Sequence, residues 1–226
     1  MIRRKEVGLP KAISVRHIRK MRGGAQSHLM EADDGHFYVV KFTNNPQHRR
    51  ILVNELVGSE LLNYLNIASP IAALIWVSEA FLTNNLDLLI DLGTEKTPVQ
   101  PGWHFGSRFP GDPSETAVYD FMPDNLFHMV TNASDFCGVL VFDKWTSNSD
   151  GRQAVFFRPP RQDCVANSAC THNPAKTSYL ALMIDQGFVF DGSKMGFFRV
   201  ARAGFVYAPV GLRKSNVLRR FPTLAG

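Results

Sequence analysis

The first part of the chain alternates apolar and polar positions with a period of two, which is typical of strands with one buried face. The alternation covers residues 12–20, with a shift of register inside the run. A second strand is predicted at residues 27–31, and a third, well-buried strand at the apolar run of residues 37–42. Turns rich in glycine or aspartate separate these runs at residues 22–26 and 33–35. We therefore predict that the chain begins with a three-stranded antiparallel meander.

The apolar spacing becomes helical at residues 50–65, which predicts an amphipathic helix of roughly four turns. Polar residues at 43–45 offer capping groups, and Pro46 suits the first turn of this helix. Ser69 and Pro70 end the periodic pattern. The leucines that carry the pattern are Leu52, Leu56, Leu61, Leu62 and Leu65.

Shorter apolar runs follow, and we predict strands at residues 71–77 and 86–92. Residues 96–113 are rich in glycine and proline, which predicts an irregular loop that crosses between two lobes. We place the N-terminal lobe at residues 1–95 and the C-terminal lobe at residues 96–226, the two together forming one domain.

The second lobe is predicted to contain a helix at residues 132–142, with Asn132 or Ser134 as its N-cap. Two further apolar runs, residues 153–157 and 179–184, are predicted to form a strand pair.

Composition narrows the class of protein only slightly. The chain has 226 residues, of which 45% are hydrophobic, and a net charge of +5. These values fit a folded domain and exclude disorder of the whole chain. The basic residues gather near the two ends, which we interpret as a solvated surface, and a nucleic-acid partner is not expected. Polar residues interrupt the longest apolar-rich run, residues 67–81, so no membrane span is expected.

The cysteines Cys137, Cys164 and Cys170 do not form a disulfide framework, and they fit a reducing compartment. No secretory signal is visible at the first residues, so we expect a cytoplasmic protein. Cys164, Cys170 and His172 lie in a polar insertion at residues 158–178, but their spacing does not match a zinc site.

The clearest candidate chemistry lies between residues 142 and 187. Asp143 precedes Asn148 by five residues, and a predicted strand pair then leads to Asp185 in an Asp-x-Gly sequence. Protein kinases deliver a catalytic base and two metal ligands in this order. We assign Asp143 as the base that accepts the proton of a substrate hydroxyl, and Asn148 and Asp185 as metal ligands. Asp150 is the rival for either role.

Two further residues fit the same chemistry. Lys41 ends the third predicted strand in Tyr-Val-Val-Lys, where its ammonium group can reach the phosphates of a nucleotide. Glu55 lies on the following helix and is the expected carboxylate partner of Lys41.

The turn between the first two strands contains Gly23, Gly24, Ala25 and Gln26. Small residues allow backbone amides to approach phosphate oxygens closely, so this turn is the candidate phosphate-covering loop.

Together these residues resemble the HipA-like kinases, in particular the short HipA-like domains found as stand-alone bacterial proteins. The most specific stretch is Phe-Asp-Lys-Trp-Thr-Ser-Asn-Ser-Asp-Gly-Arg-Gln at residues 142–153. The other matching stretches are residues 24–26, 38–42, 45–47, 54–55 and 184–187.

The resemblance implies an α+β, bilobal protein-kinase-like fold, with an antiparallel-sheet N-lobe and a reduced, mainly helical C-lobe. It implies a serine/threonine-type kinase that uses ATP and Mg²⁺ to phosphorylate an unknown hydroxyl acceptor. A regulatory or antitoxin-like partner is also implied. The functional residues carry over to Lys41, Asp143, Asn148 and Asp185.

Some features depart from the family pattern. No His-Arg pair precedes Asp143, and only about 40 residues follow Asp185, so a platform for a peptide substrate is expected to be small or missing. Two alternatives therefore remain open: a nucleotide-binding pseudokinase or interaction module, and an enzyme that transfers AMP with the same residues.

Overall fold

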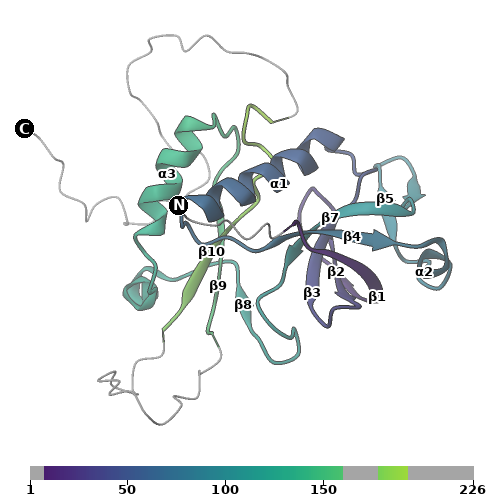
Figure 1. The fold of residues 1–226 in the computed structure, drawn as a ribbon, viewed down its shortest axis with the longest axis horizontal. Coiled ribbons are helices and arrows are strands. Elements are labelled where there is room, and N and C mark those ends of the chain that lie inside the picture. Colours follow the sequence, from purple (N-terminus) through teal and green to yellow (C-terminus); the bar gives the residue numbers. More distant parts are fainter. Residues whose placement is uncertain (1–7, 160–177, 193–226) are drawn as a thin grey trace, which may run out of the picture.

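The computed structural model describes residues 8–159 and 178–192, which form a mixed α/β structure (Figure 1). A closed five-stranded barrel lies at one end, and a three-stranded sheet with helix α3 lies at the other. Helix α1 lies between these two parts (Figure 1). Cys164, Cys170 and His172 of the polar insertion lie outside the described residues.

The elements of the N-terminal half are β1 (Lys11–Lys20), β2 (His28–Ala32), β3 (Phe37–Lys41), α1 (Arg49–Tyr64), β4 (Ala72–Val77), α2 (Glu79–Thr83), β5 (Leu89–Asp91), β6 (Lys96–Pro98) and β7 (Gly102–Arg108). Those of the second half are β8 (Val118–Tyr119), the 3-10 helix η1 (Asp124–Met129), α3 (Asp135–Trp145), β9 (Gln153–Phe157) and β10 (Leu180–Ile184).

The predicted meander is present, because β1, β2 and β3 pair in antiparallel order. Strand β1 contains register shifts between Ser14 and Arg16 and between His17 and Arg19. Such irregularities increase the local bend of a strand, which helps a small sheet to close. The barrel closes because β7 pairs with β3 and β4, and β4 pairs in parallel with the start of β1.

The prediction of an irregular loop at residues 96–113 is wrong, because this segment contains β6 and the central barrel strand β7. The glycine that suggested a loop has a packing role instead. A Cβ atom on Gly106 would lie 2.5 Å from Cγ1 of Ile75 on the neighbouring strand, so only glycine fits there. A strand that requires glycine at a close approach is not distinguishable by composition from a loop.

Helix α1 begins at Arg49 rather than in the turn that contains Pro46. His48, at a φ of 86°, is its N-cap residue, and the His48 side chain accepts a hydrogen bond from the Arg50 amide. One face of the helix packs on the barrel, where Leu52 joins Ala72 and Phe105. Further along the helix, Leu62 packs into a cluster with side chains of α3 and β10, so α1 has a partner on each side.

Helix α3 begins and ends three residues later than the predicted 132–142. Its N-cap residue Ser134 makes no capping hydrogen bond with its side chain. The Asn132 side chain instead accepts a hydrogen bond from the Ala181 amide of β10 at 2.9 Å. The three residues gained at the C-terminal end matter more, because they place Asp143 in the last turn of the helix.

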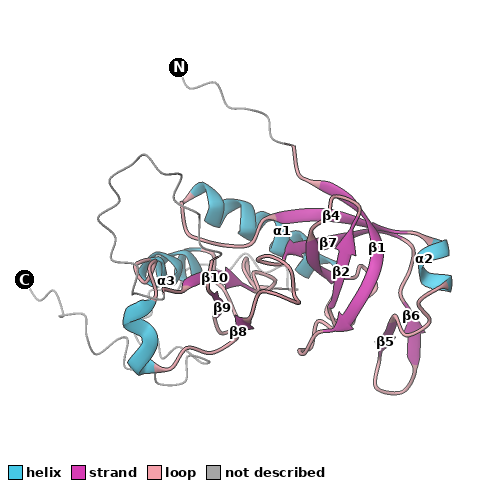
Figure 2. Cartoon of the chain, turned by 90° about the horizontal axis from the view of Figure 1, so that it is seen from below, coloured by secondary structure: helices cyan, strands magenta, loops and turns pink. Residues whose placement is uncertain are grey.

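A three-stranded antiparallel sheet in the order β10-β9-β8 packs beside α3 (Figure 2). The expectation of a mainly helical second lobe is therefore not met in the described part, where this sheet accompanies one α-helix and one 3-10 helix. The strand pair at residues 153–157 and 179–184 was predicted correctly.

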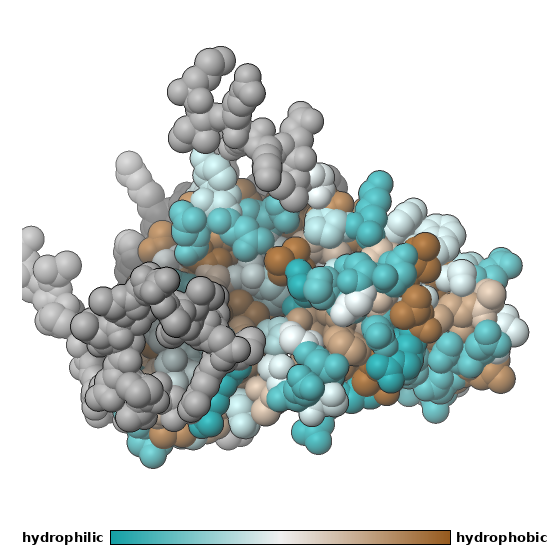
Figure 3. Space-filling view, turned by 60° about the horizontal axis from the view of Figure 1, so that its bottom comes forward, coloured by the Kyte–Doolittle hydropathy of each residue, from teal (hydrophilic) through white to brown (hydrophobic). Residues whose placement is uncertain are grey.

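In the described ranges no helix is long and apolar enough to cross a membrane. Hydrophilic side chains cover much of the face in Figure 3, with apolar side chains in separate patches between them.

Substitution of Gly106 by alanine tests the tight packing between β7 and β4. The added methyl group would displace the buried Ile75 side chain, so the free energy of unfolding should fall by about 1–3 kcal/mol. Urea unfolding measures this change. Gly8→Ala is the matched control, because a Cβ atom there meets nothing within 4 Å. Equal stability of the two variants would contradict this packing.

The buried histidine His104 should make the barrel sensitive to acid. Burial lowers the pKa of His104 from 6.5 to about 4, although a hydrogen bond to the Gln100 carbonyl opposes the shift. The unfolded chain therefore binds a proton that the folded chain rejects, and stability should be lost as the pH falls from about 6.5 toward about 4.

His104→Gln should remove on the order of 3 kcal/mol of this pH dependence. Urea unfolding across the acidic range measures it, with the exposed residue His128 changed to Gln as the control. An unaltered pH dependence in His104→Gln would show that His104 is not the acid-sensitive group.

Candidate active site

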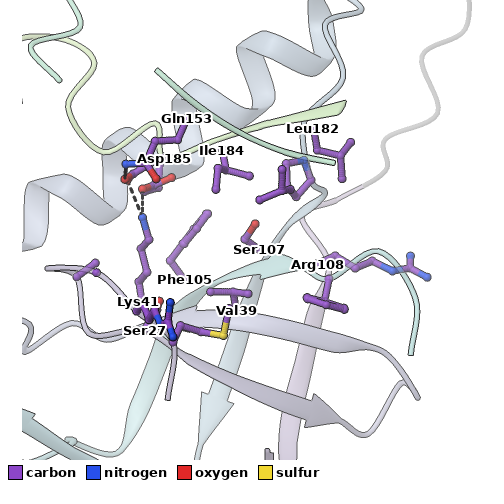
Figure 4. A pocket seen from close by; sticks show the side chains of 18 of the residues that line it. Ser27, Val39, Lys41, Phe105, Ser107, Arg108, Gln153, Leu182, Ile184 and Asp185 are labelled. Atoms are coloured by element: carbon purple, nitrogen blue, oxygen red, sulfur yellow. Dashed lines mark hydrogen bonds and ion pairs between the residues drawn. The ribbon is translucent and has the colours of Figure 1, made fainter. Parts of the chain in front are cut away.

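A cavity of about 300 Å³ lies between the barrel and the second sheet. At one side, the Lys41 side chain extends from β3 toward Asp185 and Gln153 (Figure 4). At the other side the walls are mainly apolar, although Ser107 and Arg108 also lie there (Figure 4). The apolar side chains labelled there are Val39, Phe105, Leu182 and Ile184. The cavity thus has one charged end and one end that suits a flat, apolar group.

Lys41 forms the centre of the charged end. Its ammonium group makes ion pairs with Glu55 on α1 and, at 2.9 Å, with Oδ1 of Asp185 after β10. The predicted contact between Lys41 and Glu55 is therefore present. The second oxygen of Glu55 accepts the Gln186 amide at 3.0 Å. The second oxygen of Asp185 accepts a hydrogen bond from the Gln153 side chain at 3.0 Å.

The electrostatics of this cluster follow from burial and from the shared ammonium group. Burial favours the neutral form of each group, but the carboxylates of Glu55 and Asp185 outweigh it and raise the pKa of Lys41 above its usual value. Burial also opposes ionisation of Asp185, yet the neighbouring Lys41 holds the pKa of Asp185 below its usual value. For Glu55, burial outweighs the attraction of Lys41, and the pKa of Glu55 is raised.

Helix α1 and the segment after β10 approach each other closely. A Cβ atom on Gly187 would lie 2.5 Å from Cγ2 of Ile51, and one on Gly58 would lie 2.7 Å from Cβ of Gln186. The side-chain amide of Asn54 donates to the carbonyl oxygens of Gly187 and Val189 at 2.8 Å and of Gly192 at 3.2 Å. The segment that carries Asp185 is therefore held against α1 along its length.

The glycine turn lies at the cavity, which Gly23, Gly24 and Ala25 help to line. Gln26 is different, because it does not line the cavity. Its side chain donates to the Asp91 carbonyl at 2.6 Å and accepts from the Asp91 amide at 2.8 Å. Gln26 thus anchors the turn to β5 rather than facing a ligand.

Asp143 does not have the position that was expected of a base next to a substrate hydroxyl. It does not line the cavity, and its side chain is only 8% exposed. Both of its oxygens accept hydrogen bonds from the Arg152 guanidinium, one of them from Nε at 3.0 Å. A carboxylate that is buried and occupied in this way has no free oxygen directed at a substrate.

Asn148 also stands away from the cavity. Its side-chain amide donates to Asp143 at 3.0 Å, and its oxygen accepts the backbone amide of Asp150 at 3.2 Å. The hydrogen bond between Asn148 and Asp143, five residues apart, therefore stabilises the loop between them. Asp143 and Asn148 contact each other, but neither reaches Lys41 or Asp185.

Asp150 and Gln153 occupy the positions at the cavity that were expected of Asp143 and Asn148. Asp150 was the rival in the sequence interpretation, whereas Gln153, Arg152 and Gln186 were not foreseen as part of the site. All three lie in stretches that resemble the family, but their roles depend on contacts between β9, or the residue before it, and the segment at the end of β10.

The family model of the HipA-like kinases, a family of kinase-type phosphotransferases, matches residues 15–156. No curated protein matches the chain. The family match covers more than half of the chain and includes Lys41, Glu55 and Asp150, although Asp185 lies beyond it. The chain belongs to the HipA-like kinase family.

Proposed function

We propose that this protein is a phosphotransferase of the serine/threonine kinase type, which uses ATP with Mg²⁺ to phosphorylate a hydroxyl group. The observation that carries the proposal is the Lys41 ammonium held between Glu55 and Asp185 at the charged end of the cavity. Kinases use this lysine–glutamate pair, together with a metal-binding aspartate, to hold the nucleotide phosphates. Family membership supports the same reaction class.

The shape of the cavity supports a nucleotide as the ligand. The apolar end between Val39, Phe105 and Ile184 suits an aromatic base, and Lys41 at the opposite end suits phosphate. Gly23 and Gly24 border the cavity, so backbone amides of this turn are available to approach phosphate oxygens.

We also propose the two-lobe division of the chain, with a changed boundary. Strand β7 pairs with β3 and β4, so it belongs with the N-terminal barrel and not with the second lobe that was expected to start at residue 96. The crossing between the lobes then follows Arg108. The cavity lies between the barrel and the second sheet, which is where a bilobal kinase binds its nucleotide.

The oxygen groups at the charged end fit Mg²⁺. Asp185 supplies a carboxylate and Gln153 an amide oxygen, and hard divalent cations prefer such ligands. When bound, Mg²⁺ would neutralise charge on the β- and γ-phosphates. We propose Gln153 in the ligand role expected of Asn148.

We propose Asp150 as the base in place of Asp143, because Asp150 is exposed and lines the cavity. The acceptor oxygen would bond to the γ-phosphorus as the bond from that phosphorus to the bridging oxygen of ADP breaks. The proton of the acceptor hydroxyl would pass to the Asp150 carboxylate. Lys41 would keep the phosphates in place, and Glu55 would keep Lys41 in place.

A nucleotide-binding module without catalysis is the second candidate. The position of Asn148 outside the cavity favours it, since a ligand of the kinase pattern is then missing. The identity of the hydroxyl acceptor, a regulatory or antitoxin-like partner, and a cytoplasmic location stay as predictions from the sequence.

Asp150→Asn tests the proposed base. We expect phosphate transfer to slow by about 10²–10⁴-fold. Thermal stability should change little, because Asp150 is exposed. The measurement is mass spectrometry of the purified protein after incubation with ATP and Mg²⁺, with the rate of ADP release followed in parallel.

Asp120→Asn, an exposed acidic residue that does not line the cavity, is the matched control. Full activity of Asp150→Asn would refute its role as base. A mass gain of AMP rather than phosphate in the unaltered protein would identify nucleotidyl transfer instead. Nucleotide binding without any mass gain or ADP release would favour the non-catalytic module.

Lys41→Met tests the buried cluster without any assumption about activity. The change leaves two carboxylates without their cation, and the free energy of unfolding should fall by about 3–5 kcal/mol at neutral pH. The loss should shrink at mildly acidic pH, where the carboxylates take up protons. Urea unfolding measures both values, with the exposed Lys144→Met as the control. A loss that is independent of pH would argue against the ion cluster.

A further inference from the structure

We infer that Arg152, held in place by Asp143, is a positioning residue that fixes the conformation of Asp185. This inference rests on the proposed function, because it assigns a role relative to the phosphate-binding and metal-binding end of the cavity. Neither Arg152 nor Asp143 lines that cavity, so neither is a catalytic residue.

Asp185 has an unusual backbone conformation that its neighbours must stabilise. Its φ of 62° lies in the left-handed region, which is uncommon for residues other than glycine and costs about 1 kcal/mol or more. The Arg152 guanidinium contacts the residues on both sides of Asp185. Its Nη1 donates to the Ile184 carbonyl at 3.0 Å and also to the side-chain oxygen of Gln186.

The Gln186 side chain and backbone complete this support. The side-chain amide of Gln186 donates to the Met183 carbonyl at 2.9 Å, and its backbone amide donates to Glu55 at 3.0 Å. Gln186 is 1% exposed, so these bonds do not compete with bulk water. Arg152 therefore acts on Asp185 through Gln186 and the main chain.

The orientation of Arg152 depends in turn on Asp143. Two parallel hydrogen bonds join the guanidinium to the carboxylate, and the side chains are only 4% and 8% exposed. A planar fork of this kind fixes the guanidinium in a way that a lysine ammonium cannot reproduce. Asp143 and Arg152 should therefore be needed together.

The same pair also supports Asp150. Asp143 accepts the Asn148 side chain, and Asn148 accepts the Asp150 amide, so the loop that carries Asp150 is tied to the pair. Arg152 follows Asp150 by two residues. One buried ion pair thus sets the backbone that presents both cavity carboxylates.

The experiment is Arg152→Ala in the full-length chain, with free guanidinium added at a concentration well below that which unfolds the protein. Two quantities are measured: the hydrogen exchange rate of the Gln186 amide, and the Mg²⁺ concentration for half-maximal ATP-dependent phosphate transfer. Sodium chloride at equal ionic strength is the salt control. Arg158→Ala, an exposed arginine that directly follows β9, is the matched control variant.

In Arg152→Ala, we expect the Gln186 amide to exchange at least ~10-fold faster and the Mg²⁺ requirement to rise about 10–100-fold. Guanidinium, but not sodium, should reverse both effects, and Arg152→Lys should not restore them. If Arg152→Ala does not fold, Asp143→Asn carries the same two measurements, because it frees the guanidinium without creating a cavity.

Unchanged exchange at Gln186, or an unchanged Mg²⁺ requirement in an active protein, would overturn the positioning role. A general loss of stability that guanidinium does not reverse would overturn it too. If the unaltered protein neither transfers phosphate nor binds nucleotide, the proposed function fails. The exchange rate of Gln186 and its response to guanidinium then decide by themselves whether Arg152 positions the Asp185 segment.

Discussion

The structure depends on one buried positive charge. An ammonium group removed from water is unfavourable unless carboxylates surround it, and Lys41 is almost fully buried. Its two partners come from parts of the chain that are distant in sequence, Glu55 on α1 and Asp185 after β10. The barrel, the helix and the segment after the second sheet therefore have to meet at one point, and the cavity forms around that point.

A second buried ion pair, Asp143 with Arg152, lies next to the first cluster and is joined to it through Gln186. The two clusters together contain three carboxylates and two cations, an excess of one negative charge before Asp150 is counted. Burial, together with the smaller repulsion from Asp185, raises the pKa of Glu55. A ligand that brings positive charge would relieve the excess, which fits the proposed Mg²⁺.

Much of the barrel was predictable because local patterns determine it. Alternation predicted β1, short runs bounded by turn residues predicted β2 and β3, and leucine spacing predicted α1. The predicted strand at residues 71–77 is β4, the fourth barrel strand. Strand β7 was missed, because Gly106 meets a packing requirement from Ile75 that is not visible along the chain. Lys41, Glu55 and Asp185 could be selected from the sequence because kinases use these residue types in this order, and the structure brings them into contact.

The sequence did not show which of the aspartates Asp143 and Asp150 is buried, for a physical reason. Helix α3 continues to Trp145, so Asp143 is turned into the interior, where Arg152 contacts it. The spacing between an acidic residue and an asparagine does not reveal which of two nearby aspartates is buried. That distinction depends on the exact end of one helix, which sequence patterns place least reliably.

The glycines of α1 and its neighbour have a mechanical consequence. Gly58 and Gly187 leave no room for a side chain between the helix and the segment after β10, and Asn54 holds three carbonyl groups of that segment. The helix and the segment are therefore expected to move as one unit. A rotation of α1 that moved Glu55 away from Lys41 would also move Asp185. Any partner that displaces this helix would disable the lysine and the aspartate in a single movement.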